Sequence, residues 1–231
     1  ININLSERLK KLSSFDLIFF DLNKNFIQDN FNESLSKLQR IGTKLIAIDG
    51  LLNFQKYLDL IFIPSFYLPL NKKTNINLKK IVYGWDSYLI DEKKVSLEWK
   101  NGNNILILTG GSNIPKLSNN LIGKLDSNLP SDSILNLVSG PFSSKQSLPS
   151  QSRIQIIEYL APDNLNLIMS EASYAVTVYG VTFFELLKIG IPTVVFSPYG
   201  SKDQEELKII KNLGLAMVAQ NEYDAVKMLI E

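Results

Sequence analysis

Two turns that contain glycine have the residue types and the spacing to bind a phosphate group. Each follows an apolar, strand-like run and precedes a helical pattern; the turns are Gly110-Gly111-Ser112 and Gly180-Val181-Thr182. Glycine lets the backbone approach a phosphate closely, and the serine and threonine hydroxyls can donate hydrogen bonds to its oxygens. Free backbone N–H groups and the helix dipole also favour an anion at such turns. We therefore predict that a diphosphate lies between the two turns, although tight chain reversal would explain either turn alone.

Glu185, three residues after Thr182, has two interpretations. In the first, Thr182 and Glu185 form a capping box at the start of a helix, which needs no ligand. In the second, Glu185 accepts hydrogen bonds from ribose hydroxyls, because vicinal hydroxyls suit a bidentate carboxylate. Gln204 lies in the charged run that begins the next helix, a pattern typical of a solvated first turn.

Two carboxylates, Asp21 and Asp49, end the apolar runs of residues 15–22 and 44–49. In a doubly wound sheet, such strand ends meet at the edge that faces the ligand crevice. These aspartates are therefore the candidates in the first half of the chain for activating a water molecule. The alternative is that they cap helices or solvate loops.

The absence of histidine and cysteine restricts the chemistry. A Ser-His-Asp triad, a thiolate nucleophile, a disulfide and metal sites built from these residues are excluded, so we expect no metal site. Proton transfer would have to use Asp, Glu, Lys, Tyr or water. The lack of cysteine also fits a reducing compartment, and we expect a cytoplasmic protein.

The composition is that of a folded domain protein. The 231 residues are 45% hydrophobic and carry a net charge of +1, which gives no electrostatic footprint for nucleic acid. No apolar run reaches the roughly 18 residues that a membrane helix needs, so no membrane span is expected. The chain begins with Ile1 rather than Met, from which we infer that residues upstream could have been removed.

Strand and helix patterns alternate along the chain and predict an α/β fold with two Rossmann-like domains. The domains are expected at residues 1–100 and 101–231, divided at the Asn-Gly-Asn-Asn turn of residues 101–104, with the first domain incomplete. Strands are predicted in the first half at residues 15–22, 44–49, 58–63 and 80–84, and in the second half at residues 105–108, 133–138, 154–157, 175–178, 193–196 and 216–219. Helices are predicted at residues 5–12, 29–40, 115–125 and 163–170, in a segment opened by Gly180, from Lys202, and at residues 223–230.

Several of these motifs together resemble the nucleotide-binding half of GT-B nucleotide-sugar enzymes. The motifs are Gly110-Gly111-Ser112, Tyr179-Gly180-Val181-Thr182-Phe183-Phe184-Glu185, Gly190-Ile191-Pro192, Asp203-Gln204-Glu205 and Leu213-Gly214. The nearest resemblance is to the UDP-sugar hydrolase of pseudaminic acid biosynthesis and its relatives in spore-coat polysaccharide synthesis. The order of the first-half strands fits the same family.

The resemblance implies a UDP-sugar in the cleft between the two domains. Uracil would meet the backbone near Ile157 to Leu160, ribose would meet Glu185, and Gln204 would face the sugar or the phosphate. The glycine turns would hold the diphosphate through Gly110, Gly111, Ser112, Gly180, Val181 and Thr182. Because helix N-termini stabilise the leaving diphosphate, the resemblance implies neither a metal nor a cofactor.

One departure from the family concerns catalysis. Its members open with a glycine-rich loop containing a Gly-His-x-x-Arg motif, whereas this chain has no histidine. We therefore expect either that the first elements were lost or that the protein binds a nucleotide-sugar without the usual chemistry.

The predicted function is a UDP-sugar hydrolase or glycosyltransferase of surface-polysaccharide or nonulosonate biosynthesis. The alternative is a non-catalytic nucleotide-sugar binding protein, or a subunit completed by a partner chain or a second copy at an exposed strand edge. A Rossmann domain for NAD ranks last, because the glycines after Leu108 do not complete G-x-G-x-x-G.

Overall fold

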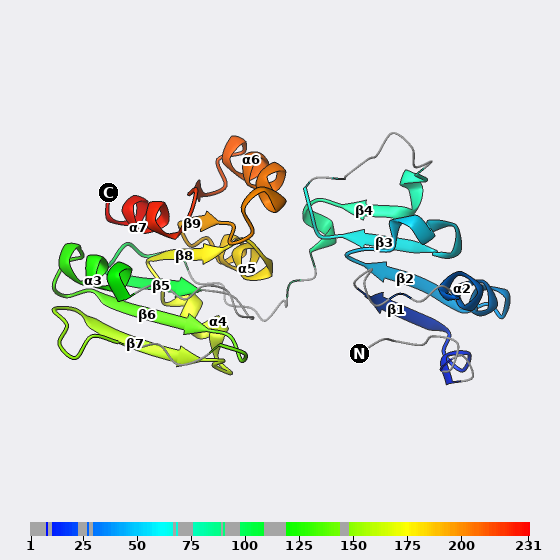
Figure 1. The fold of residues 1–231 in the computed structure, drawn as a ribbon, viewed down its shortest axis with the longest axis horizontal. Helices are drawn as coiled ribbons and strands as arrows, with labels where there is room; N and C mark the ends of the chain where they lie inside the picture. The colour runs from blue at the N-terminus through cyan, green and yellow to red at the C-terminus, as the bar shows by residue number, and fades with distance from the viewer. Residues whose placement is uncertain are drawn as a thin grey trace. The chain divides into compact units, whose positions relative to one another are not determined.

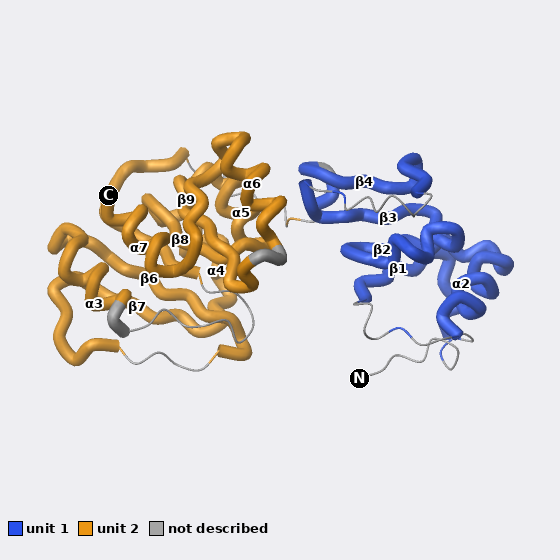
Figure 2. The backbone as a smooth tube through the Cα atoms, turned by 45° about the horizontal axis from the view of Figure 1, so that its top comes forward, with its two compact units in different colours: residues 1–89 blue, residues 90–231 orange. Residues whose placement is uncertain are grey.

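The computed structural model describes residues 8, 11–22, 27, 30–66, 68, 76–88, 90, 98–108, 119–143 and 148–231. The chain divides into two compact units, residues 1–89 and residues 90–231 (Figure 2). Each unit contains one parallel β-sheet with its own hydrophobic core.

The sheet of the first unit has its four strands in chain order. They are β1 (Leu17–Asp21), β2 (Lys44–Ile48), β3 (Leu60–Ile63) and β4 (Ile81–Tyr83). Helix α2 (Phe31–Arg40) connects β1 to β2, and the short 3₁₀ helices η2 (Leu52–Tyr57), η3 (Leu78–Lys80) and η4 (Trp85–Ser87) lie around β3 and β4 (Figure 1). Because the strands are parallel, their carboxyl ends all lie at one edge of the sheet.

One face of this sheet forms the core of the unit. Alternate residues of each strand point to it, and α2 adds Phe31, Leu35 and Leu38, all buried. Gly42, at φ 90°, follows the helix and turns the chain into β2. The helix predicted at residues 29–40 and all four predicted strands are therefore present.

The sheet of the second unit has six parallel strands in the order β10-β9-β8-β5-β6-β7 (Figure 1). The strands are β5 (Asn104–Leu108), β6 (Ile134–Ser139), β7 (Gln155–Leu160), β8 (Tyr174–Val178), β9 (Thr193–Phe196) and β10 (Met217–Val218). The helices are α3 (Asn119–Asn128), α4 (Leu165–Ser170), α5 (Val181–Ile189), α6 (Gln204–Asn212) and α7 (Glu222–Ile230).

The strand order reverses between β5 and β8. From β5 the chain proceeds outward through β6 to β7, and it then returns to the other side of β5 to build β8, β9 and β10. Counted from β5, this is the Rossmann order 3-2-1-4-5-6. In such sheets, ligands bind outside the carboxyl ends of the strands at the point of reversal.

Both faces of the second sheet are covered, which explains why its central strands are apolar on both sides. One core contains Ile105, Ile107 and Val176 of the sheet with Leu121 of α3 and Val226 of α7. The core on the other face contains side chains of α4 and α5, including Met169 and Leu186, with strand residues such as Leu106 and Ala175.

The prediction of two parallel α/β domains with Rossmann-like topology is confirmed. β7 is longer than predicted and runs to Leu160, because its ladder with β6 continues through the pairs of Leu137 with Glu158 and Ser139 with Leu160. Glu158 interrupts the apolar run, so the sequence pattern alone stopped at residue 157. α3 likewise extends to Asn128, and no helix lies between β6 and β7 in the part of that connection that the structure describes.

Asp126, near the end of α3, fastens the chain that leads into β7. Its carboxylate accepts hydrogen bonds from the Ser152 hydroxyl at 2.7 Å and from the amides of Arg153 and Ile154 at 2.7 and 3.0 Å. These bonds, with that of Ser152 the largest, lower the pKa of Asp126. The Arg153 guanidinium donates in return to the Asp126 carbonyl and so ties the end of the helix to the following strand.

Candidate ligand-binding site

The turn from β8 into α5 lies beside the point where the strand order reverses. Gly180 is the N-cap residue of α5, at φ 163° and ψ −171°, and no side chain caps the helix. The amide of Tyr179 donates to the Phe196 carbonyl at 2.8 Å, which holds the turn against β9. Helix geometry leaves the amides of Val181 and Thr182, in the first turn, without an intrahelical acceptor. They are the donors that an anion at this turn would use.

The capping-box interpretation of Thr182 and Glu185 is wrong. A capping box requires serine or threonine at the N-cap position and the acidic residue three positions later. Here Gly180 is the N-cap and α5 begins at Val181, so Thr182 already lies within the first turn. Both side chains are half-buried, and capping no longer accounts for their residue types.

The first glycine turn, with Gly110, Gly111 and Ser112, lies outside the described residues. The strand that leads into it is described, and Leu108 at its end pairs with Thr177 of β8. Parallel neighbours lie about 4.8 Å apart, so the chain leaves β5 one strand away from the Gly180 turn. That the two turns converge on a diphosphate stays a prediction.

The residues predicted to meet uracil lie on β7. Ile157 is half-buried and pairs with Asn136, whereas Leu160, the last residue of the strand, is 53% exposed. Ala161 follows at φ 46° and donates its amide to the Ser139 carbonyl at 2.8 Å. Since β7 is three strands from β8, roughly 14 Å separates the two strand ends, which is comparable to the length of an extended nucleoside diphosphate.

A polar pair at the end of β9 was missed in the sequence. The Ser197 hydroxyl, on a buried side chain, donates to the Asp203 carboxylate at 2.5 Å and accepts the Tyr199 amide at 3.0 Å. Asp203 is the N-cap residue of α6, and Gln204 is exposed at its first position. Ser197 directly follows Phe196, whose carbonyl binds Tyr179, so this pair lies next to the Gly180 turn. The signal was available, because Ser197 directly follows a buried strand.

The two candidate aspartates lie at the carboxyl edge of the first unit's sheet. Asp21 is the last residue of β1 and is exposed; its register partner is Ile48, the residue before Asp49. Asp49 is exposed as well, and its amide donates to the Phe62 carbonyl of β3 at 2.9 Å. Its φ of 52° is left-handed, a conformation that non-glycine residues seldom adopt. The neighbouring strand ends thus bring the two carboxylates to one edge.

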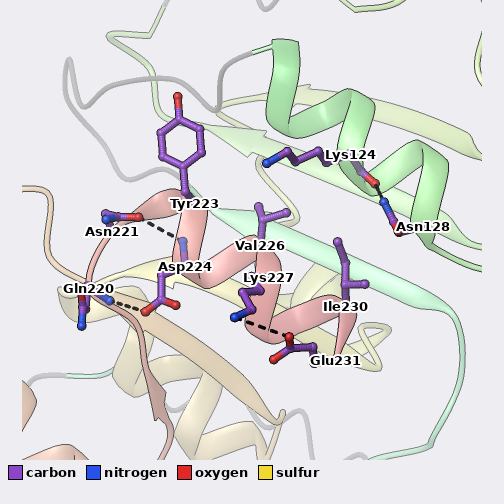
Figure 3. A pocket seen from close by; sticks show the side chains of 10 residues that line it. All are labelled: Lys124, Asn128, Gln220, Asn221, Tyr223, Asp224, Val226, Lys227, Ile230 and Glu231. Carbon is purple, nitrogen blue, oxygen red and sulfur yellow. Dashed lines mark hydrogen bonds and ion pairs between the residues drawn. The ribbon is translucent and has the colours of Figure 1, made fainter.

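A surface pocket of about 600 Å³ lies between α3 and α7 (Figure 3). Its charged groups include Lys124, Asp224, Lys227 and Glu231, and Lys227 pairs with Glu231 at 3.7 Å. It contains none of the predicted site residues. A second pocket, of about 320 Å³, lies along β1 and includes Asp21.

Two features are absent from the described part of the chain. No group of three or more acidic, histidine or cysteine side chains is placed to hold a metal ion there. No helix among these residues is long and apolar enough to span a membrane.

Comparison with known proteins shows the fold. No protein-family model matches the chain, and no curated protein sequence matches it. Among solved structures, Staphylococcus aureus MnaA in complex with UDP aligns with a TM-score of 0.52 and 14% identity over 98% of this chain and 69% of that one. A Listeria monocytogenes protein described as a UDP-N-acetylglucosamine 2-epimerase aligns with a TM-score of 0.53 and 14% identity, over 100% of this chain and 72% of that one. At these identities the likeness establishes the two-domain fold alone.

Proposed function

We propose that the protein binds a UDP-sugar, with the diphosphate at the Gly180 turn of the second unit. The observation that carries the proposal is the reversal of strand order between β5 and β8, beside which α5 begins with a glycine and no side-chain cap. This is where parallel α/β sheets bind ligands, and an uncapped helix N-terminus favours an anion. The likeness in fold to a protein solved with UDP supports the choice of nucleotide.

The roles of the individual residues follow from the same proposal. The amides of Val181 and Thr182 bind the diphosphate together with the predicted donors Gly111 and Ser112, and Glu185 binds the ribose. Gln204 faces the sugar or a phosphate, and uracil meets the end of β7 at Ile157 to Leu160. Nine residues of aligned peptide dipoles in α5 favour the negative charge that develops on UDP as it leaves.

The reaction that we propose is hydrolysis of the glycosyl phosphate bond or transfer of the sugar. In hydrolysis, a water oxygen bonds to the anomeric carbon, the bond from that carbon to the phosphate oxygen breaks, and UDP keeps the electron pair. The proton of the water passes to a carboxylate, for which Asp21 and Asp49 are the candidates. The setting that we propose is cytoplasmic biosynthesis of a surface polysaccharide or a nonulosonate.

The second candidate is a non-catalytic nucleotide-sugar binding protein or subunit. These 231 residues contain no histidine, whereas the family that the sequence resembles carries a histidine motif, so turnover by these residues would need another group to transfer the proton. Both candidates require UDP to bind, and only the first requires turnover.

Calorimetric titration with UDP, UMP and NAD tests binding, and release of UDP from UDP-N-acetylated sugars tests turnover. We expect UDP to bind more tightly than UMP, because the second phosphate adds contacts at the Gly180 turn. Binding without release of UDP would select the second candidate, and a preference for NAD would overturn both.

Glu185→Gln tests the ribose contact. Loss of one charged hydrogen-bond acceptor should weaken UDP binding by about 1–3 kcal/mol. Glu171→Gln is the matched control, because Glu171 is an exposed carboxylate at the end of α4, next to the amino ends of β5 and β8. Equal affinities of the two variants would remove Glu185 from the site.

A further inference from the structure

An aromatic cluster closes the carboxyl end of β3 and β4 in the first unit. Phe66 and Trp85 stack with ring centroids 5.7 Å apart and an interplanar angle of 28°, and Tyr88 meets the Trp85 ring edge-on at 6.2 Å and 76°. Trp85 nevertheless stays 52% exposed. The cluster lies at the sheet edge that also carries Asp21 and Asp49, where parallel sheets bind their ligands.

Backbone contacts fix the tryptophan in place. The amide of Gly84 donates to the Ser65 carbonyl at 2.9 Å and so joins the two segments that leave β3 and β4. Ser87, fully buried, donates its hydroxyl to the Ile63 carbonyl at 2.5 Å and its amide to the Gly84 carbonyl at 3.1 Å. A large aromatic side chain thus lies half exposed on a turn that these hydrogen bonds close, an arrangement that favours contact with a flat ligand surface.

The neighbouring turn after β2 is strained. Asp49, Gly50 and Leu51 have φ values of 52°, 155° and 59°, and Leu51 is buried in the core of the unit. A left-handed conformation costs a residue such as leucine about 1–2 kcal/mol. Strain of this kind collects at functional sites, where the backbone holds a side chain in a required place. Here it fixes the backbone of Asp49 at the end of β2, which lies two strands, roughly 10 Å, from β4, the strand that leads to Trp85.

We propose that the first unit has its own binding site for a hexopyranose ring, formed by Trp85 stacked on Phe66 and by the carboxylate of Asp49. The axial C–H bonds of a pyranose with equatorial hydroxyls make one face apolar, and their partial positive charge matches the negative face of an indole. Its vicinal hydroxyls can donate together to one carboxylate. The proposal concerns a sugar ring alone, and it does not depend on nucleotide binding by the second unit.

The sequence provides a direct reporter for this site. The chain has two tryptophans, Trp85 and Trp99, and Trp99 donates its indole N–H to the Ser173 carbonyl in the second unit. In the Trp99→Phe variant of the 231-residue chain, fluorescence excited at the red edge, where tyrosine does not absorb, therefore reports on Trp85 alone. We expect methyl β-glucopyranoside to reduce acrylamide quenching of Trp85 in a saturable way. Sorbitol, which has similar hydroxyls but no ring face, should leave the quenching unchanged.

Substitutions then test the two contacts by saturation-transfer NMR with the same glycoside. Trp85→Leu should raise the dissociation constant about tenfold, because it removes the aromatic face, and Trp85→Phe should raise it less. Asp49→Asn should weaken binding, whereas Trp99→Phe should bind as the wild type does. If the Trp85→Leu variant does not fold, the dissociation constants of Trp85→Phe and Asp49→Asn still test the two contacts. Quenching that is unaffected by the glycoside, or reduced equally by sorbitol, would overturn the proposal.

Discussion

A helix end can carry a glycine because its backbone conformation disfavours other residues or because a ligand approaches the backbone closely. Alanine substitutions at the two ends of α5 distinguish these two reasons. Gly190, the C-cap residue, has a left-handed φ of 86°, whereas Gly180 at the N-cap has an extended φ of 163° that any residue adopts. A Cβ atom added at either position would meet no described atom within 4 Å. The fold therefore gives a conformational reason for Gly190 and none for Gly180.

The expected effects on stability follow from these angles. Gly190→Ala should lower the free energy of unfolding by about 1–2 kcal/mol, the cost of a left-handed alanine. Gly180→Ala should change it by less than about 0.5 kcal/mol, because the poorer N-cap and the reduced entropy of the unfolded chain nearly cancel. Urea denaturation of both variants measures the difference.

The expected effects on UDP binding are reversed. If the backbone at Gly180 approaches the diphosphate, a methyl group there displaces a phosphate oxygen from the amides of Val181 and Thr182. Loss of one hydrogen bond to a charged group costs about 1.5–3 kcal/mol, which raises the dissociation constant about 12- to 140-fold. Gly190→Ala, at the other end of the helix, should bind UDP as the wild type does.

Two results of the same calorimetric and urea experiments would refute the reasoning. If Gly180→Ala binds UDP with wild-type affinity, the backbone does not approach the diphosphate at this turn. If it destabilises the protein as much as Gly190→Ala does, the fold itself requires the glycine. A wild-type protein that does not bind UDP would instead refute the proposed function.

Two further predictions concern the second unit alone. The hydrogen bonds that lower the pKa of Asp126 stabilise the fold while the carboxylate is charged, so their contribution is complete above the ordinary pKa of 3.8 and is lost as the pH falls through the lower, folded value. Asp126→Asn should therefore reduce the free energy of unfolding at pH 7. In acid-denaturation curves, the difference in this free energy between variant and wild type should become smaller below pH 3.8, and a difference that does not change with pH would contradict the reasoning. Asp132→Asn is the control, because Asp132 is an exposed carboxylate. Gly102→Ala should destabilise the protein, because the new Cβ would lie 2.8 Å from the Ser173 hydroxyl oxygen, and adding Ser173→Ala should recover most of the loss in a double-mutant cycle measured by urea denaturation.

The sequence was sufficient for the elements of the fold because parallel strands buried on both faces leave a strong signal. Residues 105–108 are all apolar, residues 175–178 are apolar except for the β-branched Thr177, and each run is followed by a turn signal. Strand order leaves no comparable trace. That β8 pairs with β5, across 66 residues from Leu108 to Tyr174, depends on long-range packing that periodicity does not encode.

The candidate site was predictable only in part. Gly180 and Asp49 could be found because both follow buried strands, and the structure places both at strand ends. The capping box was a wrong alternative. The local sequence is compatible with a helix whose N-cap residue is Thr182 and with one whose N-cap residue is Gly180, and the structure has Gly180. Ser197 also follows a buried strand and could have been named as a candidate, but its hydrogen bond to Asp203 could not be predicted, since that bond forms only when the chain turns between β9 and α6.

The carboxyl edges of the two sheets carry different features, backbone amides in the second unit and side chains in the first. This difference affects which chemical groups each edge can recognise. In the second unit the strand order reverses, and the helix that starts beside the reversal has no side-chain cap, so its first amides favour an anion whatever groups are attached to that anion. The described strands of the first unit follow chain order without a reversal, and side chains mark its edge instead: Trp85, Asp21 and Asp49. Because aromatic and carboxylate groups distinguish ring faces and hydroxyl positions, the proposed sugar site of the first unit should discriminate between glycosides independently of what the second unit binds. Substitutions at Trp85 should then change which glycoside binds and leave UDP affinity unchanged, whereas Gly180→Ala should do the reverse.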